Sequence, residues 1–213
     1  MSRRRFLLCG LAALMLSAVQ PLQAQASPAG ALAALREKAA SVRTMRSAFT
    51  QETLIPMFAR PMRSQGRLLF KRPNYLRWEY SSPMKEGFSL KGGSGVRWED
   101  DGLKRAAFTV ENDPLAGIIA RQLLDWIAFD LAAISGEYGI ELLKETPLVL
   151  RMTPLRADAL KAVAGIVITF SAEGPASLVE IEEAGGGRTS IAFEDTIING
   201  PLEDREFDQI PVP

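Results

Sequence analysis

Histidine does not occur anywhere in the 213 residues, and the single cysteine, Cys9, lies close to the N-terminus. Histidine is the side chain most often used for general acid–base catalysis and for metal ligation near neutral pH. Without histidine, and without a cysteine in the body of the chain, neither Ser-His and Cys-His nucleophile systems nor ordinary zinc sites can be assembled. We therefore expect no catalytic residues, no bound metal and no cofactor.

The sequence also lacks an excess of charge of either sign, since 25 basic residues balance 25 acidic ones. If the three arginines at positions 3–5 are removed with a leader, 22 basic residues remain against 25 acidic ones. A faintly acidic chain gives no overall electrostatic reason to bind nucleic acid or an anionic membrane. We expect no nucleic-acid partner.

The N-terminus has the order of a secretory signal peptide. Arg3, Arg4 and Arg5 precede an apolar run over 6–19, and the small-residue site Ala24-Gln25-Ala26 follows. The apolar run is shorter than the roughly 20 residues that a membrane-spanning helix needs, which favours a cleaved signal over an anchor. We expect a signal peptide over residues 1–26. Cys9 would leave with it, so the mature chain would be held by its core without disulfides.

Alternation of apolar and polar residues predicts strands over most of the mature chain. In the clearest example, Leu76, Trp78 and Tyr80 share one face of a strand while Arg77 and Glu79 lie on the other. Glycine and proline signals separate the expected strands, which cover 46–54, 64–71, 75–81, 87–91, 95–100, 104–109, 138–144, 148–153, 163–171, 178–183 and 188–195. Such regular spacing indicates an antiparallel meander or barrel.

Helical periodicity appears at three places. We expect a helix over 28–42, a helical turn within 154–162, and a longer helical segment from Pro114 to Gly136. One stripe of the longer segment contains Leu115, Ile118, Ile119, Leu123 and Trp126, and a second contains Leu124, Ile127, Leu131 and Ile134. A helix that is apolar nearly all round must be covered on more than one side. No internal repeat or linker divides the chain, so we expect one domain over 27–213.

Three motifs carry a resemblance to a known family. They are Phe49-Thr50-Gln51, the corner Lys71-Arg72-Pro73-Asn74, and the aromatic strand Leu76-Arg77-Trp78 that leads to Pro83. In order and spacing they resemble the periplasmic outer-membrane lipoprotein carriers of the LolA family, and the resemblance extends from about residue 32 to residue 208. Residues 55–64 and 92–102 look more like LolA-like paralogues, since only Trp98 of the usual pattern in the second segment is present. We therefore expect a paralogue rather than the housekeeping carrier, and the cargo stays open.

The resemblance implies an α+β, mainly β fold. The expected architecture is a half-open antiparallel β-barrel with an N-terminal helix and a helical lid over a hydrophobic cavity. The lid is expected to contain Leu115, Ile118, Ile119, Leu123 and Trp126, and the cavity to be lined by Phe49, Leu68, Phe70, Leu76, Trp78 and Trp98. By position Arg72 inherits the role of a lid latch. Its guanidinium offers several donors that can satisfy helix-terminal carbonyls.

The function implied by the resemblance is that of a periplasmic carrier. It would accept an acylated lipoprotein or another envelope lipid from an inner-membrane releasing transporter and pass it toward an outer-membrane acceptor, acting as a monomer. An alternative is a lipid-binding sensor or accessory subunit of an envelope-lipid export or biosynthesis system.

Two plainer interpretations stay open beside the carrier. Phe70 and Trp78 could be ordinary core residues, with Arg72 a surface turn residue. A hydrolase could use a carboxylate pair among Glu79, Glu99, Asp100 and Asp101. However, Glu79 alternates to the side opposite Trp78, where charges are usually only solvated. The run of glycines at 185–187 is expected to form a hairpin turn rather than a phosphate loop.

Overall fold

The computed structural model describes residues 28–58, 60–113, 124–127, 129 and 131–209. The expected signal peptide over 1–26 lies outside the described residues. So do four expected lid residues, which are Leu115, Ile118, Ile119 and Leu123. Among the described helices, none combines the length and apolar character needed to traverse a bilayer.

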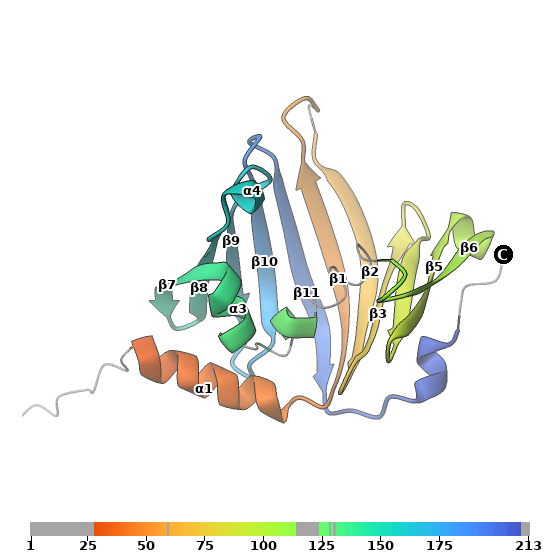
Figure 1. The fold of residues 1–213 in the computed structure, drawn as a ribbon, viewed down its shortest axis with the longest axis horizontal. Coiled ribbons are helices and arrows are strands. Elements are labelled where there is room, and N and C mark those ends of the chain that lie inside the picture. The colour runs from red at the N-terminus through yellow and green to blue at the C-terminus, as the bar shows by residue number, and fades with distance from the viewer. Residues whose placement is uncertain (1–27, 59, 114–123, 128, 130, 210–213) are drawn as a thin grey trace, which may run out of the picture.

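A single antiparallel sheet of eleven strands dominates the fold (Figure 1). Its strands are β1 (Thr44–Leu54), β2 (Met62–Lys71), β3 (Tyr75–Ser82), β4 (Gly87–Lys91), β5 (Ser94–Glu99), β6 (Lys104–Thr109), β7 (Tyr138–Glu145), β8 (Leu148–Pro154), β9 (Val163–Phe170), β10 (Ala176–Glu183) and β11 (Arg188–Ile198). Their order is β6-β5-β4-β3-β2-β1-β11-β10-β9-β8-β7, so β6 and β7 are edges that do not pair with each other. The expectation of a mainly β, half-open antiparallel architecture is confirmed.

The helices are short and lie around the sheet. They are α1 (Pro28–Ser41), η1 (Asp100–Gly102), α3 (Leu131–Glu137), α4 (Ala157–Leu160) and η2 (Asp204–Phe207), and residues 124–127 are also helical. We call the sheet face against which α1 and the 124–137 segment pack the inner face, and the other the outer face (Figure 1). The expected N-terminal helix is therefore present, and it ends one residue before the expected boundary.

Two apolar clusters cover the inner face. The first joins α1 and the 129–134 region to β8, β9 and β10, with Leu35, Phe129, Ile134, Leu150, Met152 and Ile166 among its buried members. The second lies over β1 to β4 and β6, and contains Phe49, Leu68, Phe70, Leu76, Trp78, Leu90 and Phe108. Ile191 and Phe193 of β11 pack against both clusters. Strand β11 is therefore the seam between the two halves of the inner face.

The outer face has its own smaller core under the C-terminal helix η2. Leu69 is fully buried there with Leu202 and Phe207. The Ser89 hydroxyl donates a hydrogen bond of 2.6 Å to the Phe207 carbonyl, and Arg46 forms a 2.6 Å ion pair with Glu206. These contacts attach η2 to the outside of the sheet.

Strand β11 is longer than its alternation pattern indicates. Asp195 has a φ of 51°, and the pairing with β1 shifts between Arg46 and Ala48. An extra residue in one strand reverses which side chains face inward, so the period-two pattern breaks at the bulge. The strand continues beyond it to Ile198, three residues past the expected end.

Candidate functional site

A cavity of about 230 Å³ lies on the inner face where the two apolar clusters meet. Its walls come from both halves of the sheet. Leu68, Trp78 and Tyr80 contribute from β2 and β3, and Ile168, Val179 and Ile191 contribute from β9, β10 and β11. Because alternate residues of each strand point to the same face, one apolar set per strand suffices to build this wall.

Trp126 and Ile127 of the helical segment 124–127 also line the cavity. Both are half-buried, and the Trp126 ring contacts Tyr138 of β7 edge-on with 6.3 Å between ring centroids. Trp126 is the one expected lid residue within the described part of the chain. It lines the cavity, and its role in a lid stays a prediction.

An aromatic group forms the floor of the cavity on the β1 to β3 side. The Phe49 ring lies 4.4 Å from the Trp78 ring and 5.3 Å from Tyr80, and Trp78 meets Phe193 at 6.2 Å. The Phe49–Trp78 pair is tilted by 30° and the other two pairs meet edge-on, and aromatic pairs of this kind add about 0.5–1.5 kcal/mol each beyond the area they bury. Among the expected cavity residues, Leu68 and Trp78 reach the cavity wall, whereas Phe49, Phe70 and Leu76 pack in the same cluster behind it.

The polar atoms of the cavity wall satisfy one another. The Tyr80 hydroxyl donates to Gln51 Oε1 at 2.9 Å, and burial raises the pKa of Tyr80, so the phenol stays protonated. The Ser47 hydroxyl lies 3.0 Å from the Glu194 carbonyl and 2.8 Å from the Thr196 hydroxyl. An apolar guest therefore leaves these groups paired, and avoids the cost of burying an unsatisfied donor or acceptor.

Arg72 lies at the β2–β3 corner and binds the C-terminal end of α1. Its Nε donates to the Val42 carbonyl at 2.7 Å and its Nη2 donates to the Ala39 carbonyl at 3.0 Å. The last carbonyls of a helix have no partner within it, so a cation here satisfies both their hydrogen bonds and the helix dipole. The expected contact with helix-terminal carbonyls is present, and the helix that provides them is α1. A latch to residues 114–123 lies outside the described residues.

The placement of Trp98 in the cavity is wrong. Trp98 pairs with Gly87 in the β4–β5 register and lies on the outer face, where its ring centroid is 5.0 Å from the Arg77 guanidinium carbon. Strand β5 directs Gly95 and Arg97 inward and Val96 and Trp98 outward, because Gly95 is the residue that pairs with inward-facing Leu90. Trp98 follows Gly95 and lies between Arg97 and Glu99, so the alternation pattern of this strand does not indicate which of its faces is apolar.

Three of the four acidic residues that could suggest a hydrolase, Glu79, Asp100 and Asp101, are in ion pairs, and Glu79 lies apart from the other two. Glu79 lies on the outer face between Arg67 and Arg77, and Arg77 Nε donates to it at 2.6 Å. Burial lowers the pKa of Arg77, and the adjacent Glu79 opposes this effect. Asp100 and Asp101 pair with Lys104 and Lys85 at 2.6 and 2.8 Å. Within the part of the chain that the structure describes, no group of three or more acidic, histidine or cysteine side chains could hold a metal ion.

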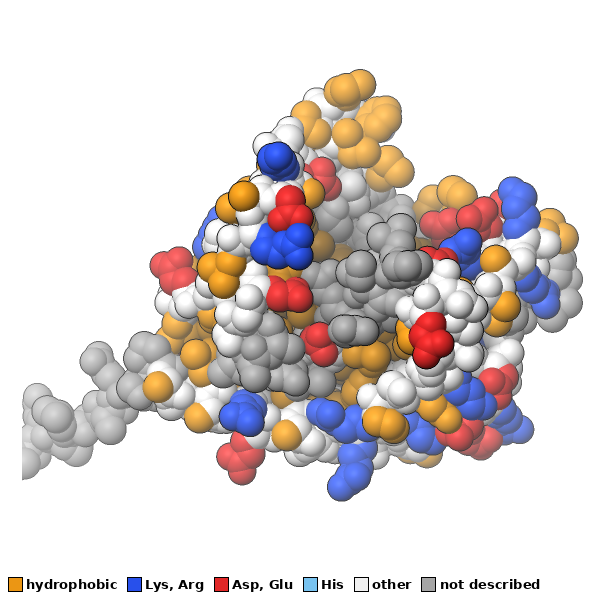
Figure 2. All heavy atoms as spheres, viewed as in Figure 1, with side chains coloured by type: hydrophobic (Ala, Val, Ile, Leu, Met, Phe, Trp, Pro, Cys, Tyr) orange, Lys and Arg blue, Asp and Glu red, His pale blue; other side chains and the backbone are white. Residues whose placement is uncertain are grey.

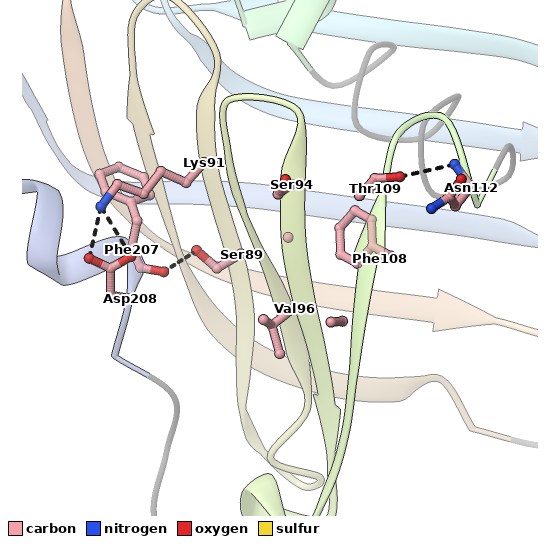
Figure 3. A pocket seen from close by; sticks show the side chains of 11 residues that line it. Ser89, Lys91, Ser94, Val96, Phe108, Thr109, Asn112, Phe207 and Asp208 are labelled. Carbon is pink, nitrogen blue, oxygen red and sulfur yellow. Dashed lines mark hydrogen bonds and ion pairs between the residues drawn. The ribbon is translucent and has the colours of Figure 1, made fainter.

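A second hollow, of about 650 Å³, lies between η2 and strands β4 to β6 (Figure 3). Lys91 reaches Asp208 at 2.8 Å and Ser89 donates to the Phe207 carbonyl across one side of it. Small residues such as Ser94 and Ala107 form much of the remaining lining. It is broader and more polar than the inner cavity, and its interactions attach the C-terminal segment to β4. The sequence pattern does not indicate η2, because its two buried apolar side chains, Leu202 and Phe207, are separated by four charged residues.

Residues 40–209 match the family model described as outer membrane lipoprotein carrier protein LolA. The chain belongs to the LolA family. It is 27% identical over 190 residues to the outer-membrane lipoprotein carrier protein of Chromohalobacter salexigens, covering 88% of this chain and 85% of that one. With the protein of the same name from Methylibium petroleiphilum it shares 27% identity over 194 residues, covering 89% of this chain and 90% of the relative.

The solved structure of the Pseudomonas aeruginosa MucA/MucB complex contains a similar fold. The TM-score is 0.51 at 15% sequence identity, and the match covers 83% of this chain and 59% of that chain. At that identity the likeness concerns the fold alone. The LolA family is a family of carriers rather than enzymes, and its members among the relatives are named for carrying lipoproteins.

Proposed function

We propose that this LolA-family protein is a periplasmic carrier that holds acyl chains of a lipoprotein, or of another envelope lipid, in the inner cavity. The observation that carries the proposal is the apolar hollow between the two halves of the sheet, lined also by Trp126 and Ile127. Its wall is apolar apart from side chains that bind one another, such as Tyr80 and Gln51. Such a wall suits hydrocarbon and offers no charged group to a polar ligand.

The cavity volume sets the scale of binding. A methylene group is comparable in size to a water molecule, whose share of liquid volume is about 30 Å³. A hollow of about 230 Å³ therefore holds roughly eight methylenes, each contributing about 0.8 kcal/mol when removed from water. About 6 kcal/mol of gross stabilisation follows for the part of an acyl chain that the cavity holds.

In the proposed cycle, an inner-membrane transporter releases the acylated cargo to this protein and an outer-membrane acceptor receives it. Membership of a family of lipoprotein carriers supports this direction of transfer. The cycle needs an acceptor with higher affinity and movement of the expected lid, and no covalent step. As a paralogue, the protein would serve a cargo of its own.

The test compares two adjacent residues of β10. Val179 lines the cavity and is 7% exposed, whereas Leu178 pairs with Thr169 and Ala192 and points to the opposite face. Val179→Trp fills part of the hollow, and Leu178→Trp adds the same ring outside it. Each variant is purified from the periplasm, analysed by native mass spectrometry for bound lipid, and titrated with a fluorescent fatty acid.

We expect wild type and Leu178→Trp to carry acylated cargo and to bind the fatty acid. Val179→Trp should bind it at least tenfold more weakly, because it occupies the space of several methylenes. Wild-type protein that carries no lipid and takes up no fatty acid would refute the carrier proposal.

A further inference from the structure

The exposed large apolar side chains of the described residues collect at one end of the sheet. This end, which we call the hairpin end, carries the β1–β2, β3–β4, β5–β6, β8–β9 and β10–β11 connections (Figure 1). Its exposed apolar residues are Leu54, Met57, Phe58, Met62, Met84, Leu103, Leu155 and Leu160. Among the other exposed large apolar residues, Leu143 and Ile197 lie away from this end. Exposed apolar side chains gathered on one part of a surface are typical of sites that contact a protein partner or a membrane.

The β1–β2 turn extends furthest and is the most apolar part of the hairpin end. Met57 is 91% exposed and Phe58 56%, and Figure 2 shows apolar side chains at the projecting tip. The ladder between β1 and β2 ends at the Thr53–Met62 pair and that between β1 and β11 at Leu54–Arg188, so Met57 and Phe58 lie beyond the paired part of the sheet. Two large side chains held in water at a tip lose the stabilisation that burial would give them.

The charge of the same turn favours an anionic surface. Residues 54–63 contain Arg60 and Arg63 and no acidic residue. Arg63 binds Glu52 at 2.9 Å from the base of the turn, and Arg60 is exposed nearer the tip. Segments that enter the boundary between lipid headgroups and acyl chains combine exposed apolar side chains with neighbouring basic residues, and this turn has both. The net charge of the whole chain does not predict binding to an anionic membrane, so the prediction depends on the local positive charge of this turn.

We propose that the β1–β2 turn inserts Met57 and Phe58 into the surface of an anionic lipid bilayer. The shape of the tip favours a bilayer over a folded partner, because a narrow projection from a single hairpin offers little area for a protein interface of standard size. Lipid headgroups separate around such a projection and need no matching groove.

The insertion gives the inner cavity a defined orientation, and this step rests on the proposed carrier function. Thr189 lines the cavity and pairs with Thr53, and the next pair along the ladder is Leu54 with Arg188. Ile181 of the cavity wall lies at the same level of β10. The lining therefore reaches the base of the inserted turn, which places one end of the cavity next to the source or destination of an acyl chain.

The test is co-sedimentation of the full-length mature protein with vesicles of phosphatidylglycerol and phosphatidylcholine. The variant is Met57→Ser/Phe58→Ser, and the matched control is Leu143→Ser/Ile197→Ser, which removes two exposed apolar side chains elsewhere. We expect roughly tenfold weaker binding for the turn variant and wild-type binding for the control, since partial burial of Met and Phe is worth about that factor. Vesicles of phosphatidylcholine alone should bind the wild type more weakly, because the arginines lose their attraction.

Three results would overturn the inference. They are a wild type that does not sediment with anionic vesicles, a turn variant that binds like wild type, and a control that loses as much binding as the turn variant. Titration with a fluorescent fatty acid in the absence of vesicles separates this test from that of the carrier function. The turn variant should retain that binding, since neither substituted residue lines the cavity.

Discussion

Replacing Arg72 with leucine tests how the β2–β3 corner holds the N-terminal helix. The substitution removes two charge-assisted hydrogen bonds, of 2.7 Å to the Val42 carbonyl and 3.0 Å to the Ala39 carbonyl. It also removes a guanidinium that lies 5.9 Å from the Phe70 ring. The backbone bond from Arg72 N to the Arg43 carbonyl stays, so the corner itself is preserved.

The magnitude follows from the number of bonds lost. Hydrogen bonds that involve a charged group contribute about 1.5–3 kcal/mol each, and half-buried carbonyls recover part of this from water. We expect Arg72→Leu to lower the free energy of unfolding by about 2–3 kcal/mol, and Arg72→Lys, which keeps one donor group, by about half as much. Urea unfolding followed by circular dichroism measures both values.

Hydrogen exchange locates the effect. In Arg72→Leu the amides of α1 should exchange faster than those of β8 and β9, because the helix loses its C-terminal attachment while the sheet keeps its ladders. If Arg72 also serves as a latch, the substitution should change the rate at which a fluorescent lipid is transferred to acceptor vesicles, although the protein remains folded. Unchanged stability and unchanged exchange in α1 would refute the attachment, and unchanged transfer would refute the latch.

Two further predictions concern the inner and outer faces. Phe49→Ala should cost about 3–5 kcal/mol in urea unfolding, because Phe49 is 2% exposed and contacts three aromatic rings, whereas Phe58→Ala at the exposed tip should stay within about 0.5 kcal/mol. A cost below 1 kcal/mol for Phe49→Ala would contradict the packed floor. Burial acts to raise the pKa of Glu206, but the Glu203 amide and Arg46 outweigh it and hold the pKa below its ordinary value of 4.5. Glu206→Gln should therefore destabilise the protein by about 0.5–1 kcal/mol at pH 7. In thermal unfolding, the stability difference between wild type and variant should shrink as the pH falls below 4.5 and through the lowered pKa of Glu206 in the folded state. A stability difference that does not depend on pH would exclude the ion pair as its cause.

Alternation in the sequence predicts the half of the site that lies on β2 and β3. Leu76, Trp78 and Tyr80 alternate with Arg77 and Glu79, and a period-two pattern of this contrast indicates which face is apolar. The cavity wall from β9 to β11 was not assigned, because residues such as Ile166, Val167 and Ile168 are apolar on both faces and give no contrast. Trp98 was misplaced for the related reason that its strand contains glycine where the inner face would need a side chain.

Contacts between distant segments set the features that local pattern could not predict. The expected start of β2 was Ser64, and the strand begins at Met62 because its ladder with β1 continues to Thr53. The partner of Arg72 was expected in the lid, and the structure provides α1, whose last carbonyls come within reach only when β1 and β2 pair. The bulge at Asp195 depends likewise on how β11 meets β1.

The two unpaired edges of the sheet bear on how much cargo one protein can accept. A closed barrel has its diameter fixed by the number of strands and their stagger, so its interior cannot widen without breaking backbone hydrogen bonds. Here β6 and β7 do not pair with each other, and among the described residues the two halves share Ile191 and Phe193 of β11 and the helical segment 124–127. We therefore expect that flattening the sheet at β11 would enlarge the space between the halves while the backbone ladders stay intact, and that the fold would accept guests that differ in length and bulk.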